Sequence, residues 1–153
     1  MFLIAHAAIG AAVAPLTGSP LPAFFLGWLT HYLADAVPHG DESLGRWATA
    51  RDGIRRFVFL AGVDFLLVAA ILAIVFVARG FDWTILAGAV GATVPDFMWG
   101  LEKTFQRRLF GPFQDWHGLA HGIIKKKIPT AAGLALQFLV AAASWFWVAG
   151  AGR

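Results

Sequence analysis

Long apolar stretches alternate with short polar or proline-containing segments along the chain. Five such stretches cover residues 2–14, 21–37, 57–78, 84–99 and 130–150. A helix needs about 20 apolar residues to cross roughly 30 Å of hydrocarbon, a length that the third and fifth stretches reach, whereas the first is short. The pattern predicts an all-α integral membrane protein in which residues 1–153 form a single domain, a bundle of about five transmembrane helices.

The segments between these stretches support further predictions. Residues 113–124 are too short for a span, so we expect a half-helix or a re-entrant segment there. Residues 39–56 are the most polar part of the chain, and we expect a solvated connection with an amphipathic turn near its middle. Gly88, Gly91 and Ala92 give the fourth stretch a small-residue face, which allows close contact between helices in lipid.

Composition supports the membrane interpretation. Hydrophobic residues make up 59% of the chain and charged residues 14%, whereas a soluble domain averages about 25% charged residues. The net charge of +3 comes from basic residues in short loops, and no aromatic stacking platform accompanies them, so nucleic-acid binding is not expected. Cysteine is absent, which excludes disulfides and leaves His, Asp and Glu as possible metal ligands.

The distribution of Lys and Arg predicts an orientation. If the first four stretches cross in turn, residues 39–56 and 101–129 share one side of the membrane and hold four and six of the twelve Lys and Arg residues. The positive-inside rule makes that side cytoplasmic, with the N-terminus in the cytoplasm and the C-terminus outside. The three lysines at 125–127 are interpreted as a topology anchor beside anionic lipid.

The strongest chemical signal lies at the end of the second stretch. His31 and Asp35 are four residues apart, which puts an imidazole and a carboxylate on the same helix face. Pro38 stops the helix, and His39 is expected just beyond its end. Two imidazoles and a carboxylate within nine residues form half of a metal site.

Five more residues extend this half-site. Asp64 is an isolated carboxylate in the apolar third stretch, where a charge costs about 2.5–3.5 kcal/mol, so it requires a partner or a cation. On the predicted topology, all the candidates fall near the cytoplasmic face. We predict that they meet in one cavity and form a metal site. The candidate ligands are His6, His31, Asp35, His39, Asp64, Asp96, His117 and His121.

Other roles for these residues are open. The His31 and Asp35 side chains can form a hydrogen bond that fixes two helices, and Asp64 can be protonated or paired with Arg55 or Arg56. The cluster can instead hold haem, lock helices together in a non-catalytic membrane protein, or form the relay of a metal or proton transporter. A transporter requires ligands through the whole depth of the bilayer, and their confinement to one half argues against it.

Three short segments resemble a known family. Residues 27–35 (GWLTHYLAD) are similar to a motif of the bacterial membrane-bound metal-dependent hydrolases. Residues 94–96 (VPD) are similar to the Leu-Pro-Asp of that family, and His117 with His121 resembles its paired-histidine segment. The family consists of small inner-membrane proteins thought to share the all-helical fold of zinc-dependent phospholipase C and single-strand nucleases.

The resemblance implies a zinc-dependent hydrolase of the bacterial inner membrane. Zinc lowers the pKa of bound water to about 7, and Asp64 or Asp35 would accept the proton, which makes these two the catalytic candidates. A site near the inner leaflet suits a lipid-borne or amphiphilic phosphoester. The implied cofactor is one to three zinc ions, ligated by His31, Asp35, Asp64, Asp96, His117 and His121, with His6 and His39 as further candidates.

Overall fold

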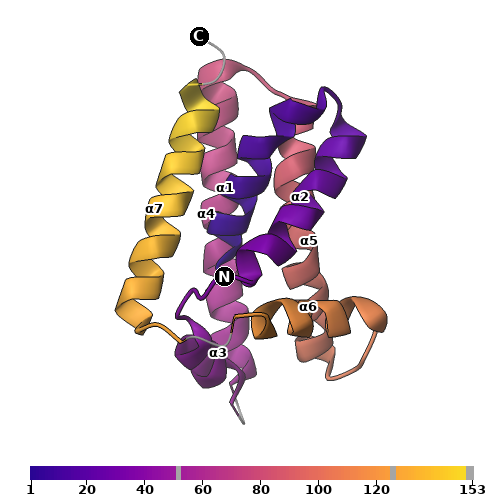
Figure 1. Cartoon of the computed structure of the whole chain (residues 1–153), viewed down its shortest axis with the longest axis vertical. Helices are drawn as coiled ribbons and strands as arrows, with labels where there is room; N and C mark the ends of the chain where they lie inside the picture. Colours follow the sequence, from indigo (N-terminus) through magenta and orange to yellow (C-terminus); the bar gives the residue numbers. More distant parts are fainter. Residues whose placement is uncertain (51–52, 125–126, 151–153) are drawn as a thin grey trace.

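The structure, a computed structural model, describes residues 1–50, 53–124 and 127–150. Within these residues the chain forms seven α-helices, one 3-10 turn and no β-strand (Figure 1). The all-helical fold class is thereby confirmed. In chain order the elements are α1 (Leu3–Val13), η1 (Ala14–Thr17), α2 (Pro20–Asp35), α3 (Glu42–Thr49), α4 (Ile54–Arg79), α5 (Trp83–Phe105), α6 (Pro112–Gly122) and α7 (Thr130–Gly150).

Three of the described helices are long and apolar enough to cross a membrane, namely α4, α5 and α7, with 26, 23 and 21 residues. This agrees with a membrane protein, but the expected count of about five spans is not confirmed. Helix α1 has 11 residues and α2 has 16. Because a helix rises about 1.5 Å per residue, both fall short of the roughly 30 Å of hydrocarbon.

Prolines account for two differences from the predicted helix ends. Helix α2 stops at Asp35 rather than at residue 37, because the residue before Pro38 is driven out of the helical conformation. Helix α5 instead continues through Pro95 to Phe105, past the predicted end at residue 99. A proline inside a membrane helix is tolerated where neighbouring helices satisfy the backbone groups that it frees.

Polar and apolar side chains are distributed as expected for a protein surrounded by lipid. Large apolar side chains on the long helices point outward, for example Phe59, Ile74 and Phe138, which are 69%, 67% and 72% exposed. The interior instead holds alanines together with polar side chains such as His6 and Asp35. Large exposed apolar surfaces are rare on soluble monomers, so this distribution agrees with hydrocarbon around the bundle.

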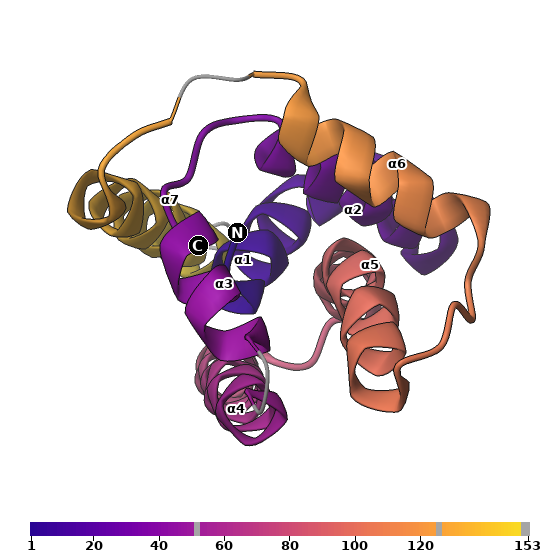
Figure 2. The same cartoon turned by 90° about the horizontal axis from the view of Figure 1, so that it is seen from below.

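Helix α1 occupies the centre of the bundle (Figure 2). It contacts α2, α4, α5 and α7, and its alanines at positions 5, 7, 8 and 11 are fully buried. A helix that is apolar on all faces has to be covered on all faces, and its small side chains let the neighbouring helices approach closely. Helix α1 therefore carries His6 into the interior of the molecule.

Backbone contacts between α5 and the first two helices fix their relative positions. A Cβ atom at Gly88 would overlap the carbonyl group of Gly10 on α1, and one at Gly91 would overlap that of Phe24 on α2. Only glycine permits this approach, so the predicted small-residue face on this helix is confirmed. The contacts hold α1, α2 and α5 together near the residues that carry the candidate ligands.

Helices α3 and α6 lie at the end of the bundle opposite the C-terminus (Figure 1). They belong to the two basic connections that were predicted to share one side of the membrane, and both connections do reach this end. The short segment predicted at 113–124 is α6, and the amphipathic turn predicted in the polar connection is the eight-residue α3. Lys125 and Lys126 of the predicted anchor lie outside the described residues.

The side chain of Glu102 binds the backbone of the loop between α5 and α6. Glu102 Oε1 accepts hydrogen bonds from the backbone N–H groups of Leu109 at 2.6 Å and Phe110 at 2.7 Å. The chain also turns at Gln106, whose φ of 52° is left-handed. This loop places α6 across the end of α2, where its histidines become part of the candidate site.

Substituting Gly88 by Ala tests the close packing of α5 on α1. The new Cβ would overlap the carbonyl group of Gly10, so we expect the free energy of unfolding in detergent to fall by about 1–3 kcal/mol. Gly62→Ala on α4 is the matched control. No atom lies within 4 Å of the position that its Cβ would take. Replacing a glycine within a helix by alanine raises the free energy of unfolding by about 0.5–1 kcal/mol, so this variant should be slightly more stable. Equal stabilities of the two variants would contradict the packing described above.

Candidate metal centre

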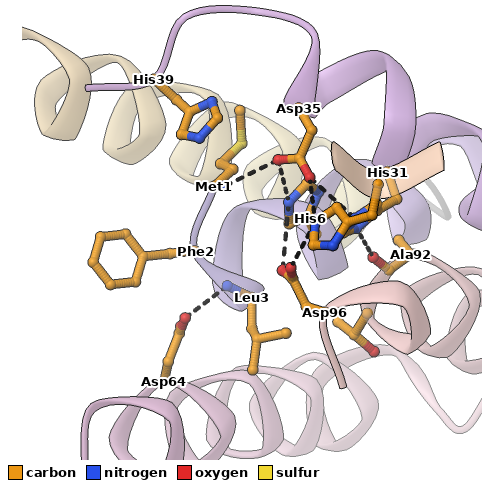
Figure 3. Close-up of polar contacts among 12 residues, drawn as sticks. Met1, Phe2, Leu3, His6, His31, Asp35, His39, Asp64, Ala92 and Asp96 are labelled. Carbon is orange, nitrogen blue, oxygen red and sulfur yellow. Dashed lines mark hydrogen bonds and ion pairs between the residues drawn. The ribbon is translucent and has the colours of Figure 1, made fainter. Parts of the chain in front are cut away.

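The carboxylate of Asp35, the last residue of α2, is the centre of the candidate site (Figure 3). Its Oδ1 lies 3.1 Å from Nε2 of His6 on α1, and its Oδ2 lies 3.1 Å from Nε2 of His31, one turn earlier on α2. The two imidazole rings are stacked with their centroids 4.0 Å apart. All three side chains are buried, so the predicted half-site on α2 is joined by the histidine of the central helix.

Helix α6 brings two more histidines to the same carboxylate. The Nε2 atoms of His117 and His121 lie 3.1 and 3.2 Å from Asp35 Oδ2, and 3.2 Å from each other. Because the two histidines are four residues apart, both project from one face of α6. His117 is buried, whereas the side chain of His121 is 37% exposed. Solvent therefore reaches the cluster from the side of α6.

Asp96 of α5 adds a second carboxylate. Its Oδ2 lies 3.6 Å from His6 Nε2, and its Oδ1 lies 3.4 Å from His117 Nε2. The ligand atoms fall into two groups that share Asp35, and within each group they lie within 4.8 Å of one another. One group is His6, His31, Asp35 and Asp96, and the other is Asp35, His117 and His121.

The hydrogen bond of His31 to the backbone suits a cation in this cluster. Its Nδ1 lies 2.8 Å from the carbonyl oxygen of Ala92, and because a carbonyl can only accept, this nitrogen carries the proton. In the neutral ring, Nε2 then directs a lone pair at the Asp35 carboxylate. Metal-ligating histidines have the same arrangement, in which a carbonyl fixes the tautomer and the other nitrogen binds the ion.

The remaining donors also suit a divalent metal ion. Nδ1 of His6 is buried without a hydrogen-bond partner among the described residues, and Nε2 of the same ring faces the carboxylates of Asp35 and Asp96. The Nε2 atoms of His117 and His121 face each other, although only one of them can donate to the other. Imidazole and carboxylate ligands suit zinc. A divalent ion would also offset the negative charges of Asp35 and Asp96, which are costly to bury without a partner.

Asp64 lies at the start of α1, outside both groups. Its Oδ2 accepts a hydrogen bond from the backbone N–H of Leu3 at 2.6 Å, and its Oδ1 accepts one from Ile4 at 3.1 Å; Figure 3 shows it apart from the cluster. The first N–H groups of a helix have no partner within the helix, and hydrocarbon offers them none. The partner that Asp64 requires is therefore the N-terminal end of α1.

His39 also lies outside both groups, beside Asp41. Its Nδ1 donates to the carbonyl oxygen of Val37 at 2.8 Å, and its Nε2 lies 3.1 Å from Asp41 Oδ1. Burial lowers the pKa of His39, but the contact with Asp41 outweighs burial and holds that pKa above its usual value. Burial raises the pKa of Asp41, and the contact with His39 holds it below its usual value. The pair is therefore a local ion pair at the edge of the cluster.

Two groups at the cluster were not identified from the sequence. The α-amino group of Met1 lies 2.9 Å from Asp35 Oδ1. Gln137 of α7 accepts a hydrogen bond from the N–H of Phe2 and donates one to the carbonyl of His39, both at 2.8 Å. Gln137 could have been identified, because it is a single amide side chain in an otherwise apolar span. No pattern in the sequence points to the α-amino group of Met1.

A cavity of about 1120 Å³ opens beside the cluster. Asp96, His117 and His121 line it, and Asp35 lies behind them. Lys103 and Arg107 line the same cavity, which adds positive charge near the carboxylates and imidazoles. The carboxylates of Glu102 and Asp115 line it as well. A molecule in the cavity can thus reach the exposed side of the ligand cluster.

Comparisons with known proteins give no assignment. No protein-family model, curated protein or solved structure matches the chain. The resemblance of residues 27–35 and 94–96 to the membrane-bound metal-dependent hydrolases therefore stays a prediction.

Asp64→Asn separates the capping of α1 from metal binding. The amide keeps one acceptor oxygen where the carboxylate has two, so one N–H of α1 loses its partner, and we expect a loss of about 1–3 kcal/mol in the free energy of unfolding. Zinc content, measured by elemental analysis of the same detergent-purified sample, should not change. Unchanged stability together with reduced zinc content would place Asp64 among the ligands instead.

Proposed function

We propose that this protein is a membrane-embedded, metal-dependent hydrolase that cleaves a phosphoester at the cytoplasmic face of the bacterial inner membrane. The observation that carries the proposal is the convergence of four imidazole Nε2 atoms on the Asp35 carboxylate, each 3.1 or 3.2 Å from one of its oxygens. This donor set supports zinc as the metal. Bound metal ions, together with Lys103 and Arg107 in the lining of the adjoining cavity, would offset the carboxylates there and favour an anionic substrate.

The two ligand groups support two metal positions that share Asp35. The group of His6, His31, Asp35 and Asp96 has four donors, enough to fill a tetrahedral site. The group that contains His117 and His121 has three donors, the number typical of catalytic zinc sites, in which one position stays open for water or substrate. Both of these histidines line the cavity, so the open position would face it. Phosphatases and nucleases commonly use paired metal ions.

Asp96 has one oxygen for each of two roles. Its Oδ2, beside His6, would belong to the four-donor group, and its Oδ1, 3.4 Å from His117 Nε2, is the oxygen best placed to accept a proton during hydrolysis. Zinc, when bound, supplies a water that is acidic near neutral pH and stabilises the entering and leaving oxygens. Asp96 lines the cavity, and its side chain keeps 18% exposure. Asp35 is one of the two proton acceptors expected from the sequence, but imidazoles surround it, and it is better suited to bind metal ions. Both oxygens of Asp64, the other expected acceptor, bond the backbone of α1.

The geometry gives less support to the alternative functions. Haem requires a flat slot between axial ligands, but the ring centroids of His31 lie only 4.0 Å from those of His6 and 5.2 Å from those of His117. A transporter requires ligands along the whole path through the bilayer, whereas the cluster gathers at the end of the bundle near α6. A non-catalytic metal site would not require an adjoining cavity, and this favours the hydrolase.

Zinc content tests the assignment of ligands. Detergent-purified protein that has been loaded with zinc and desalted should retain about two ions per chain. His121→Gln should retain about one, because only the three-donor group loses a ligand. His39→Gln is the matched control and should retain both, since His39 belongs to neither group. Equal zinc contents in the three proteins, measured by elemental analysis, would contradict the assignment.

Hydrolysis of bis(p-nitrophenyl) phosphate tests the activity. Turnover should require zinc, disappear on chelation and return when zinc is restored. Asp96→Asn should lower kcat by about 100- to 10,000-fold, the contribution usual for a general base. The zinc content of this variant is measured in parallel, so that loss of the metal is distinguished from loss of the base. Zinc binding without turnover of any phosphoester would refute the hydrolase and leave a structural metal site.

A further inference from the structure

We infer that the substrate is a membrane lipid whose phosphoester headgroup meets the metal centre while its acyl chain lies in the cleft between α4 and α5. This inference rests on the proposed function and names its class of substrate. Three features of the cavity carry it: an apolar part at membrane depth, an opening toward the lipid, and a polar end that contains the ligand cluster.

The apolar part of the cavity lies between two membrane-spanning helices. Ala61, Gly62 and Phe65 of α4 face it from one side, and Phe97 of α5 faces it from the other. The whole cavity, with its polar and apolar parts, has a volume of about 1120 Å³, which exceeds the roughly 300–1000 Å³ usual for pockets that bind small molecules. Water finds few hydrogen-bond partners between apolar walls, so a hydrocarbon chain fills this space with a more favourable free energy.

The cleft is open to the side of the bundle where Gly62, Phe65 and Phe97 line it. Phe65 and Phe97 are 58% and 59% exposed, and a Cβ atom at Gly62 would meet nothing within 4 Å. Nearer the end of the bundle the helices do meet, since the rings of Phe57 and Trp99 contact each other with centroids 5.4 Å apart. Because α4 and α5 are surrounded by hydrocarbon at this depth, a lipid chain can enter without leaving the bilayer.

The polar end of the cavity complements an anionic headgroup. Lys103 lies over the ring of Trp99, with its ammonium nitrogen 5.5 Å from the ring centroid, and Arg107 also lines the cavity. Arg108 is already paired with Asp115 at 2.6 Å. The same space is therefore bordered by Lys103 and Arg107 and by the side of the cluster that His117 and His121 form. A phosphate there would lie between the cations and the metal ligands, with its apolar chain directed between α4 and α5.

A soluble phosphoester fits the cavity less well. It would use the polar end and leave the apolar walls around Phe65 and Phe97 without a partner. A lipid without a phosphate would fill the apolar part and bring no group that could bind at the metal ligands of the polar end. Only an amphiphile with one anionic group and a long apolar chain matches both ends.

Photo-crosslinking tests this inference without requiring turnover. The protein is reconstituted into phosphatidylcholine vesicles that contain a phosphatidic acid with a photoreactive diazirine in its acyl chain, and labelled peptides are identified by mass spectrometry. We expect labelling to concentrate on residues 57–65 and 96–104 and to be competed by unlabelled phosphatidic acid but not by inorganic phosphate. Gly62→Leu should reduce this labelling about tenfold, because its side chain would displace roughly two methylene groups of the lipid.

Ala70→Leu is the matched control. Ala70 lies on the same helix, is exposed and does not line the cavity, so labelling of the cleft should not change. Labelling spread evenly over exposed side chains such as Leu66 and Phe138, and unaffected by Gly62→Leu, would overturn the inference. Competition by inorganic phosphate would also overturn it, because it would indicate a site for the headgroup alone.

The inference and the proposed function can fail separately. Cleft labelling by phosphatidic acid with no zinc-dependent hydrolysis of any phosphoester would support the lipid site and refute the hydrolase. Zinc-dependent hydrolysis of bis(p-nitrophenyl) phosphate without cleft labelling would support the hydrolase and overturn the lipid site. Zinc-dependent release of phosphate from phosphatidic acid, slowed by Gly62→Leu and not by Ala70→Leu, would support both.

Discussion

The buried carboxylate of Asp35 is the constraint on which the rest of the structure depends. A charge in an apolar bundle is stable only if its surroundings supply compensating groups. Here the α-amino group of Met1 lies 2.9 Å from the carboxylate, and α1, α2 and α6 supply the imidazoles around it. The helices that supply them are brought to this point by their packing. The polar groups around Asp35 therefore depend on the packing of the apolar helices that carry them.

Small residues make that arrangement possible. The glycines where α5 meets α1 and α2 let three backbones come into contact, which brings His6, His31 and Asp96 within reach of a single ion. In lipid the hydrophobic effect does not drive helices together, so close van der Waals contact has to do so. The same glycines thus serve both the association of the helices and the spacing of the ligands.

Much of the fold and part of the site could be predicted from the sequence. Spacing of four residues within one helix placed His31 with Asp35 and His117 with His121, because such pairs share a face whatever the tertiary structure. The number of spans could not be predicted, since an apolar helix buried inside a protein and one buried in lipid have similar compositions. Helix α1 illustrates this similarity, because it is apolar and yet is surrounded by α2, α4, α5 and α7.

The partner of Asp64 could not be predicted for a different reason. A membrane carboxylate requires compensation, but the sequence does not say whether a cation or a row of backbone N–H groups supplies it. The answer depends on which helix end lies next to it, and that is a property of the tertiary fold. The isolated Gln137 presented the same problem, as its hydrogen bonds join residues distant in the sequence, namely Phe2, His39 and Asp41.

These two side chains also have a consequence for biosynthesis. The N–H groups of Phe2, Leu3 and Ile4 are synthesised before their acceptors, which belong to Asp64 in α4 and Gln137 in α7. Until the ribosome has made both acceptors, these donors lack the partners that they have in the folded protein, and hydrocarbon cannot replace them. Helix α1 can therefore complete its hydrogen bonds only after α7 has been made, and the polar centre is assembled no earlier.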